Sequence, residues 1–272
     1  MDHLSLGEFV VRSSVSIVSL DPATQIPCNW GSGFMLRYQG RHFLVTVYHV
    51  IKVDLDHMYI EMGKDASGHG ILQPIGGFYT FGQIVLKKKD KLDNLIQKIE
   101  EPDDFLDVAF AEISEGLQIW QEPLDFRHFQ VREGLKITVD MDLATEPKKE
   151  ETYAFAGRIR HDPRGAVVHS TPTFKYAIEY RSKMNDDHIF AAPELCIDKA
   201  DYEGCSGAPI LNDQGNLVAI ARAVKHGTKV IYAFSIAKLK LLIDTVLAVE
   251  MIGKSEARSA YIADEKGQSE RS

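Results

Sequence analysis

The feature that most constrains the fold is a long series of short segments with β-strand character, separated by glycine, proline and small polar residues. These segments are rich in β-branched and aromatic residues, which pack well on a pleated sheet. In the first half of the chain they are residues 9–20, 31–38, 41–51, 76–88 and 106–113. A second series begins at residue 134 and ends with KVIYAFSI at residue 236. The body of the protein is therefore predicted to be β-sheet.

The two series define two halves of the chain. Each half contains about six predicted strands, and the break between them falls near residues 115–130. Two groups of this size are typical of two β-barrels or two β-sandwiches. We accordingly place an N-terminal domain at residues 1–118 and a C-terminal domain at residues 119–252.

Two segments have helical rather than strand character. Residues 91–101 carry apolar side chains on a short amphipathic stripe, and residues 236–252 form a longer run with little to break a helix. We expect the longer segment to be a helix that closes the C-terminal domain. From Gly253 onward the residues are polar and small, so 253–272 is expected to be a flexible tail.

Composition and charge exclude several classes of partner. The chain has 272 residues, of which 44% are hydrophobic, and this is enough for a sizeable core. A formal net charge of −8 disfavours nucleic acid or an anionic membrane as the main partner. The sequence has no run of about 18 apolar residues, so no membrane-spanning helix is expected.

The N-terminus and the cysteines favour a cytoplasmic protein. The first residues lack the cationic start of a signal peptide. There are only three cysteines, Cys28, Cys196 and Cys205. A small and odd number is not typical of a disulfide framework. Because no propeptide is evident after Met1, activation by cleavage is not expected.

Three short motifs carry residues with catalytic potential. FLVTVYHVI is an apolar strand that ends in His49, and FLDVAFAEI places Asp107 at the entry to a strand. The third is a turn, Gly-Cys-Ser-Gly-Ala-Pro, in which Ser206 is the hydroxyl residue. A serine hydroxyl is a weak nucleophile until a neutral imidazole accepts its proton, and an unperturbed imidazole titrates near neutral pH. The motifs therefore contain a nucleophile, a base and an acid.

In their order and their contexts, these motifs resemble those of the trypsin/chymotrypsin-like serine peptidases. That family shows Thr-Ala-x-His, Asp-Ile/Val-Ala and Gly-x-Ser-Gly-Gly-Pro in the same order. WGSGFML, before the histidine motif, resembles the family's Gly-Ser/Thr-Gly-Phe strand, and YAFSIAKLKLLI resembles its last strand and closing helix. The resemblance spans roughly residues 9–247. It implies an all-β fold of two six-stranded antiparallel β-barrels with a C-terminal helix.

The resemblance also implies a catalytic triad of His49, Asp107 and Ser206. His49 would take the proton of Ser206 and later pass it to the leaving amine, while Asp107 would fix the imidazole tautomer and stabilise the imidazolium. The backbone N–H groups of Gly204 and Ser206 would form the oxyanion hole, in which one donor lowers the barrier by about 3 kcal/mol. The implied function is a serine endopeptidase, a hydrolase that acts through an acyl-serine intermediate on a protein or peptide substrate.

The turn departs from the family pattern at two positions. Ala208 replaces the usual second glycine, which is a small change in size. Cys205 precedes the serine, and a cysteine nucleophile would require the viral 3C-like frame Gly-x-Cys-Gly. Because Gly204 directly precedes Cys205, the frame fits Ser206 instead. Cys205 is then interpreted as a small packed side chain, or alternatively as a redox-sensitive neighbour of the nucleophile.

By family position, the pocket for the residue before the scissile bond can also be placed. Its expected base and walls are Ala200, Asp201, Arg222, Ala223 and Val224. If Arg222 pairs with Asp201, the pocket is small and apolar, and cleavage after small or medium aliphatic residues is expected. If Arg222 points inward without a partner, an acidic residue is expected to be preferred.

Cofactors and metals are not expected. The histidines and cysteines have no tight ligand spacing, and the glycines of PIGG at 74–77 lack the context of a phosphate loop. Two rival functions remain open: a catalytically idle member of the same fold that binds proteins, and an esterase-like hydrolase with the same acyl chemistry. A cytoplasmic peptidase also needs restraint, which we expect from a regulatory protein partner or from a loop such as 64–75.

Overall fold

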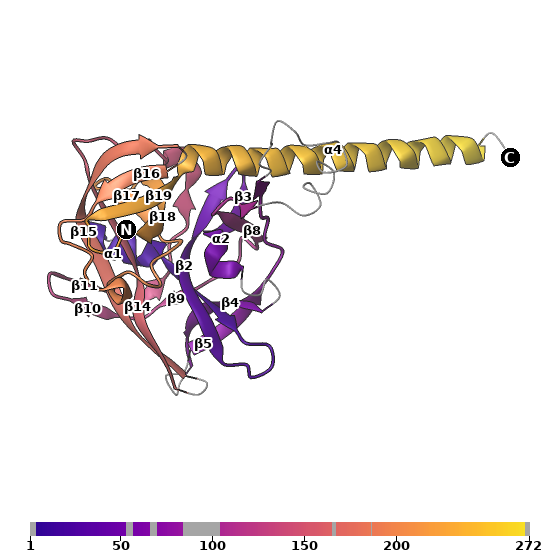
Figure 1. Cartoon of the computed structure of the whole chain (residues 1–272). Coiled ribbons are helices and arrows are strands. Elements are labelled where there is room, and N and C mark those ends of the chain that lie inside the picture. The colour runs from indigo at the N-terminus through magenta and orange to yellow at the C-terminus, as the bar shows by residue number, and fades with distance from the viewer. Residues whose placement is uncertain are drawn as a thin grey trace, which may run out of the picture. The chain divides into compact units, whose positions relative to one another are not determined.

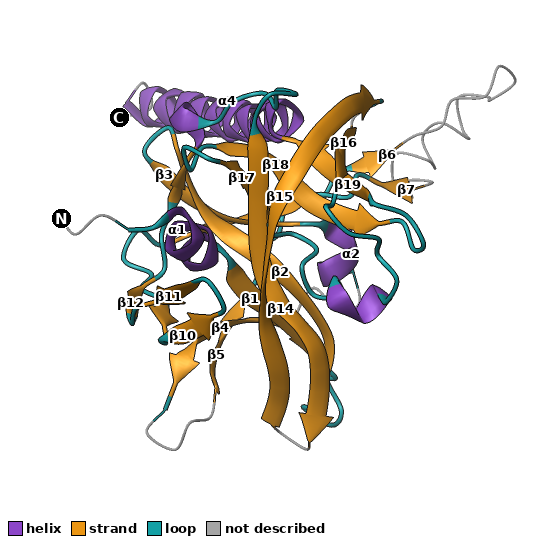
Figure 2. Ribbon diagram, turned by 90° about the vertical axis from the view of Figure 1, so that its left-hand side faces the viewer, coloured by secondary structure: helices purple, strands orange, loops and turns teal. Residues whose placement is uncertain are grey.

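The structure is a computed structural model of the chain. It describes residues 4–52, 57–65, 70–83, 104–164, 167–185 and 187–269. The chain forms two compact units, residues 1–236 and residues 237–272 (Figure 1). Figure 2 shows that strands make up most of the first unit, with α1 and α2 as its short helices.

The first half of the β structure is a seven-stranded sheet. Six strands follow the order β5-β4-β1-β2-β3-β8, and a further strand, β13, pairs with β2. The strands of this sheet are β1 (Val15–Leu20), β2 (Pro27–Tyr38), β3 (Arg41–Thr46), β4 (Met58–Lys64), β5 (Gly70–Ile75), β8 (Ala109–Ile113) and β13 (Val139–Asp140). Four residues beyond β5, Tyr79 exchanges two backbone hydrogen bonds with Phe110 of β8. This isolated bridge connects β8, at one end of the sheet, with the segment that follows β5, at the other end.

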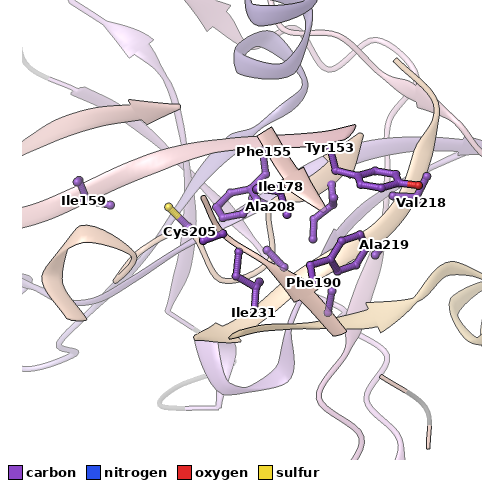
Figure 3. Close-up of a cluster of buried hydrophobic side chains, with 14 residues drawn as sticks. Tyr153, Phe155, Ile159, Ile178, Phe190, Cys205, Ala208, Val218, Ala219 and Ile231 are labelled. Carbon is purple, nitrogen blue, oxygen red and sulfur yellow. The ribbon is translucent and has the colours of Figure 1, made fainter. Parts of the chain in front are cut away.

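The second half is a closed six-stranded barrel in the order β14-β15-β16-β19-β18-β17. Its strands are β14 (Thr152–Arg164), β15 (Val167–Met184), β16 (Asp187–Ala191), β17 (Pro209–Asn212), β18 (Leu217–Val224) and β19 (Val230–Ser235). Tyr153, Phe155 and Phe190 are almost fully buried in the barrel core, with small residues such as Ala208 and Ala219 between them (Figure 3). The predicted all-β fold with a C-terminal helix is confirmed.

Shorter elements connect and flank these two sheets. The two-stranded pairs are β6 (Gly82–Gln83) with β7 (Asp104–Phe105), β9 (Trp120–Gln121) with β12 (Gly134–Leu135), and β10 (Leu124–Phe126) with β11 (Phe129–Val131). The short helical elements of the first unit are α1 (Leu6–Ser13), α2 (Tyr48–Ile51), η1 (Met141–Leu143) and η2 (Lys199–Asp201).

The prediction of one strand at 9–20 is wrong in its first part. Residues 6–13 form α1, and only Val15–Leu20 is a strand. Ser5 caps the helix, because its Oγ accepts a hydrogen bond from the backbone N–H of Glu8 at 3.2 Å. A serine followed three residues later by a glutamate is the signature of a capping box, so the sequence did carry the signal for this helix.

The strand expected at 76–88 is present in part among the described residues, as the bridge at Tyr79 and the short strand β6 at 82–83, and residues 84–88 lie outside the described residues. A strand that was not expected, β5 at 70–75, lies within the segment 64–75 that was predicted to be a loop. Pro74 is tolerated there because β5 lies at the end of the strand order, where a missing N–H interrupts no internal ladder. Gly77 then takes a left-handed conformation, φ +70°, which ends the strand.

The helical predictions have different outcomes. The helix expected at 91–101 lies outside the described residues. The C-terminal helix α4 (Ile236–Ser269) is present and continues beyond residue 252. The domain boundary at 118/119 stays a prediction. Across the part of the chain that the structure describes, no helix is long and apolar enough to span a membrane.

Candidate active site

The first sheet brings His49 and Asp107 together. His49 lies in α2, three residues after the end of β3, and Asp107 lies two residues before β8. These two strands are neighbours in register, with Thr46 opposite Ala109, so the two side chains leave the sheet at the same place. His49 Nδ1 lies 2.9 Å from both carboxylate oxygens of Asp107. The backbone N–H of His49 also donates to Asp107 Oδ1 at 3.0 Å.

These contacts keep Asp107 ionised. Burial alone would raise the pKa of this carboxyl, but the hydrogen bonds and charge of His49, with the charge of Arg222, hold the pKa below its ordinary value. An ionised carboxylate that accepts from Nδ1 leaves Nε2 of the ring free to act as a base. The arrangement therefore suits the orienting role that the resemblance implies for Asp107.

The turn that carries Ser206 is held by β2 of the first sheet. Ser32 donates its Oγ to the carbonyl of Gly204 at 2.7 Å and its backbone N–H to the carbonyl of Ser206 at 2.8 Å. Gly204 and Gly207 have φ values of +98° and +93°. A Cβ on Gly207 would overlap the carbonyl oxygen of Ser32. The turn therefore requires glycine for its backbone conformation and for its close approach to β2.

His49, Asp107 and Ser206 line one cavity of about 410 Å³. The Ser206 hydroxyl donates to the carbonyl oxygen of Arg222 at 3.0 Å. Within the described residues, no hydrogen bond joins Ser206 Oγ to His49. The structure thus brings the histidine and the aspartate into direct contact and places the serine in the same cavity with its hydroxyl turned to Arg222.

The backbone N–H groups expected in an oxyanion hole are not used by the protein. Among the described residues, neither the Gly204 N–H nor the Ser206 N–H has a protein acceptor, whereas the N–H groups of Cys205 and Gly207 donate to Tyr202 and Ala221. Gly204 and Ser206 also line the cavity. Within the described part of the chain, both donors are therefore free of a competing acceptor.

The residues expected in the specificity pocket separate into two groups. Arg222, Ala223 and Val224 line the cavity. Ala200 and Asp201 lie in η2 and are not among its lining residues. The other side chains that line it include Asn29, Trp30, Phe155, Lys199, Tyr202, Glu203, Ala221 and Ile231. The wall is therefore mainly apolar and aromatic, and its charged side chains are Asp107, Lys199, Glu203 and Arg222.

Neither of the two alternatives for Arg222, a pair with Asp201 or an inward side chain without a partner, is found. Arg222 Nε lies 3.2 Å from Asp107 Oδ2, and its Nη1 lies 2.9 and 2.8 Å from the two carboxylate oxygens of Asp187. Asp201 instead accepts from Arg160 Nη2 at 2.6 Å. The physical reason is that η2 turns Asp201 toward β14, where Arg160 reaches it.

Cys205 is a packed core residue. Its side chain belongs to the hydrophobic cluster of the barrel and is 3% exposed (Figure 3). Burial raises the pKa of its thiol to about 12, so the reactive thiolate is strongly disfavoured. The packing interpretation of Cys205 fits these observations, and the redox interpretation does not.

Trp30, Tyr202 and Asp187 are among the residues of the site that were not predicted from the sequence. Trp30 lines the cavity and stacks on His161, with ring centroids 5.1 Å apart. Tyr202 lines it two residues before Gly204, and Asp187 holds Arg222. The position of Tyr202 beside the glycine turn was a usable signal. The sequence has no comparable signal for Asp187, which lies 35 residues from Arg222.

Comparison with known proteins gives information on the fold. No protein-family model matches the chain, and no curated protein matches its sequence. A solved serine endoprotease from Yersinia pestis is similar over 91% of this chain and 68% of its own length, at 13% identity and a TM-score of 0.52. The scabies mite inactivated protease paralogue S-D1 is similar over 90% of this chain and 97% of its own, at 11% identity and a TM-score of 0.53. These likenesses show that the chain has the fold of the trypsin-like serine proteases.

Proposed function

We propose that the protein is a serine endopeptidase that hydrolyses peptide bonds through an acyl intermediate on Ser206. The observation that carries this proposal is the contact of His49 Nδ1 with Asp107 at 2.9 Å, in the wall of the cavity that also contains Ser206. This contact orients the histidine as a base toward the interior of the site.

In the proposed reaction, the Ser206 hydroxyl first leaves the carbonyl of Arg222 and donates to His49 Nε2. Catalytic hydrogen bonds of this kind are often long or misaligned until substrate binds. His49 then accepts the proton as Ser206 Oγ bonds to the scissile carbonyl carbon, and the oxyanion is bound by the N–H groups of Gly204 and Ser206. His49 passes the proton to the leaving amine, and water hydrolyses the acyl-serine by the same route.

For the substrate, we propose cleavage after small or medium aliphatic residues. Phe155, Val224 and Ile231 give the cavity an apolar wall. Arg222 is held by two carboxylates, and Lys199, the other cation that lines the cavity, is accompanied there by Glu203. We therefore expect no strong preference for an acidic residue before the scissile bond. A peptide library that shows strong selection for lysine, arginine or an acidic residue would contradict this choice.

A second candidate is a catalytically idle protein that uses the same fold for binding. The observation that favours it is the hydrogen bond of Ser206 Oγ with the Arg222 carbonyl in place of His49. The inactivated scabies mite paralogue shows that this fold also occurs in a protein described as inactive.

The deciding experiment is labelling with a fluorophosphonate probe, which reports an activated serine without knowledge of the substrate. We expect the wild-type chain to be labelled and Ser206→Ala to remain unlabelled. His49→Ala should also lose labelling, which shows that the reaction needs the base. A folded wild-type protein that resists the probe across pH 6–9 would support the binding protein instead.

A further inference from the structure

Arg222 makes three different contacts with the candidate site. Its Nε lies 3.2 Å from Asp107 Oδ2, and its Nη1 contacts both oxygens of Asp187 at 2.8–2.9 Å. Its carbonyl oxygen accepts the hydrogen bond from Ser206 Oγ at 3.0 Å. One residue thus touches both the carboxylate partner of His49 and the proposed nucleophile.

A β-bulge explains how one residue can do this. In the pairing of β18 with β19, Ala221 faces Ala233 and Ala223 faces Tyr232, so Arg222 is an extra residue without an opposite partner. The extra residue of a bulge is left out of the ladder, and the local twist changes the direction of its side chain. Its carbonyl is therefore available to Ser206, and its guanidinium points out of the barrel toward Asp107.

The ion pairs of Arg222 cross between the two halves of the fold. Asp107 precedes β8 of the first sheet, whereas Asp187 begins β16 of the barrel. Arg222 connects the two carboxylates, and its charge compensates both of them in part. The Arg222 side chain is 36% exposed, so solvent screens these ion pairs and their contribution to the free energy of unfolding is small. Their main effect is to fix the position of the guanidinium group.

We propose that Arg222 is a positioning residue that aligns the His49–Asp107 pair with Ser206, and that Asp187 holds Arg222 in place for this role. The inference rests on the proposed endopeptidase function, but the contacts of Arg222 with Asp107 and Asp187 do not depend on that function. Arg222 acts through these groups and takes no part in bond making.

The proposal has an electrostatic consequence with a definite sign. Arg222 and Asp187 share with His49 a second cavity of about 370 Å³. Besides Asp107, the charged side chains that line the two cavities with His49 are Lys52, Asp104, Asp187, Lys199, Glu203 and Arg222. Loss of the Arg222 cation would favour the protonated imidazole, whereas loss of the Asp187 anion would disfavour it. The two substitutions therefore act in opposite directions on the titration of His49.

The first test measures the ring signals of His49 by NMR as a function of pH in the Ser206→Ala background, which needs no activity. We expect Arg222→Ser to move the titration midpoint upward by about 0.5–1 pH unit and Asp187→Asn to move it downward by about 0.3 unit. Arg222→Lys keeps the cation and should stay within about 0.3 unit of the parent. Arg37→Ser, which breaks the pair with Asp140 and lines neither cavity, should change nothing.

The second test measures the rate of fluorophosphonate labelling against pH in the proteins that retain Ser206. We expect Arg222→Ser to lower the plateau rate at least tenfold and to move the profile upward, with partial rescue in Arg222→Lys. A lower rate with an unmoved profile would mean a merely structural role and would overturn the proposal, as would midpoints equal to that of Arg37→Ser. If wild type is not labelled, the proposed function fails, while the NMR titration still decides the position of Arg222.

Discussion

The two halves of the fold contribute to the candidate site in different ways. The first sheet presents His49 and Asp107 already in contact, because the register of β3 against β8 places them side by side. The barrel presents Ser206 on a turn of left-handed glycines, and its hydroxyl is bonded to Arg222 rather than to His49. Strand register positions His49 and Asp107, whereas the backbone conformation of a turn positions Ser206. Side-chain changes at His49 and Asp107 should therefore act mainly on the chemistry, while backbone changes in the turn around Ser206 should cause the larger losses of stability.

The largest effect is expected at the nucleophile. Ser206→Ala removes the only proposed acyl acceptor and should lower turnover by about 10⁶-fold. Its Tm should stay close to that of wild type, because one hydroxyl on the cavity wall is lost and the turn keeps its glycines. Turnover and Tm measured on the same preparation check both parts. Near-wild-type turnover would remove Ser206 from the mechanism.

The second largest effect is expected at Asp107, in the first half of the fold. Asp107→Asn keeps the size of the side chain but favours the wrong tautomer of His49, so turnover should fall by roughly 10⁴-fold. Steady-state kinetics at the pH of the wild-type plateau measure this loss. A variant that keeps more than a tenth of the activity would show that the contact between His49 and Asp107 does not orient the base.

A glycine substitution tests the backbone of the second half. In Gly207→Ala the new Cβ overlaps the Ser32 carbonyl at φ +93°, so we expect a loss of about 2–4 kcal/mol in the free energy of unfolding. Gly40→Ala is the matched control, because Gly40 has φ +72° with open space around it. That control should lose only about 1 kcal/mol. Urea denaturation of both variants measures the difference, and equal losses would refute the role of close packing.

The smallest effect concerns acid stability. The pKa of Asp107 is lowered in the folded state, so its ionised form adds stability above the ordinary aspartate pKa of about 3.9, and this is lost as pH falls. We therefore expect the difference in Tm between wild type and Asp107→Asn to be smaller at pH 3.5 than at pH 6.5. A difference that stays constant or grows on acidification would show that Asp107 is not stabilised by its charge.

The sequence alone determined the features that depend on local patterns. Alternating β-branched and aromatic residues indicated the β class, because the side chains of a strand alternate between its faces. The motifs around His49, Asp107 and Ser206 indicated residues that the structure places in the wall of one cavity. The capping signal of α1, Ser5 followed by Glu8, is equally local, but the prediction of a strand at 9–20 did not use it.

Only the tertiary structure decided which groups meet across the chain. Asp187 and Arg222 are 35 residues apart and come into contact because β16 and β18 both flank β19. A single extra residue in β18 decides that Arg222 leaves the ladder and reaches Asp107 rather than Asp201. A bulge depends on how two strands pair, and a one-residue change of register redirects every side chain beyond it. The pattern of one strand does not contain that register, so the partners of Arg222 could be seen only in the folded protein.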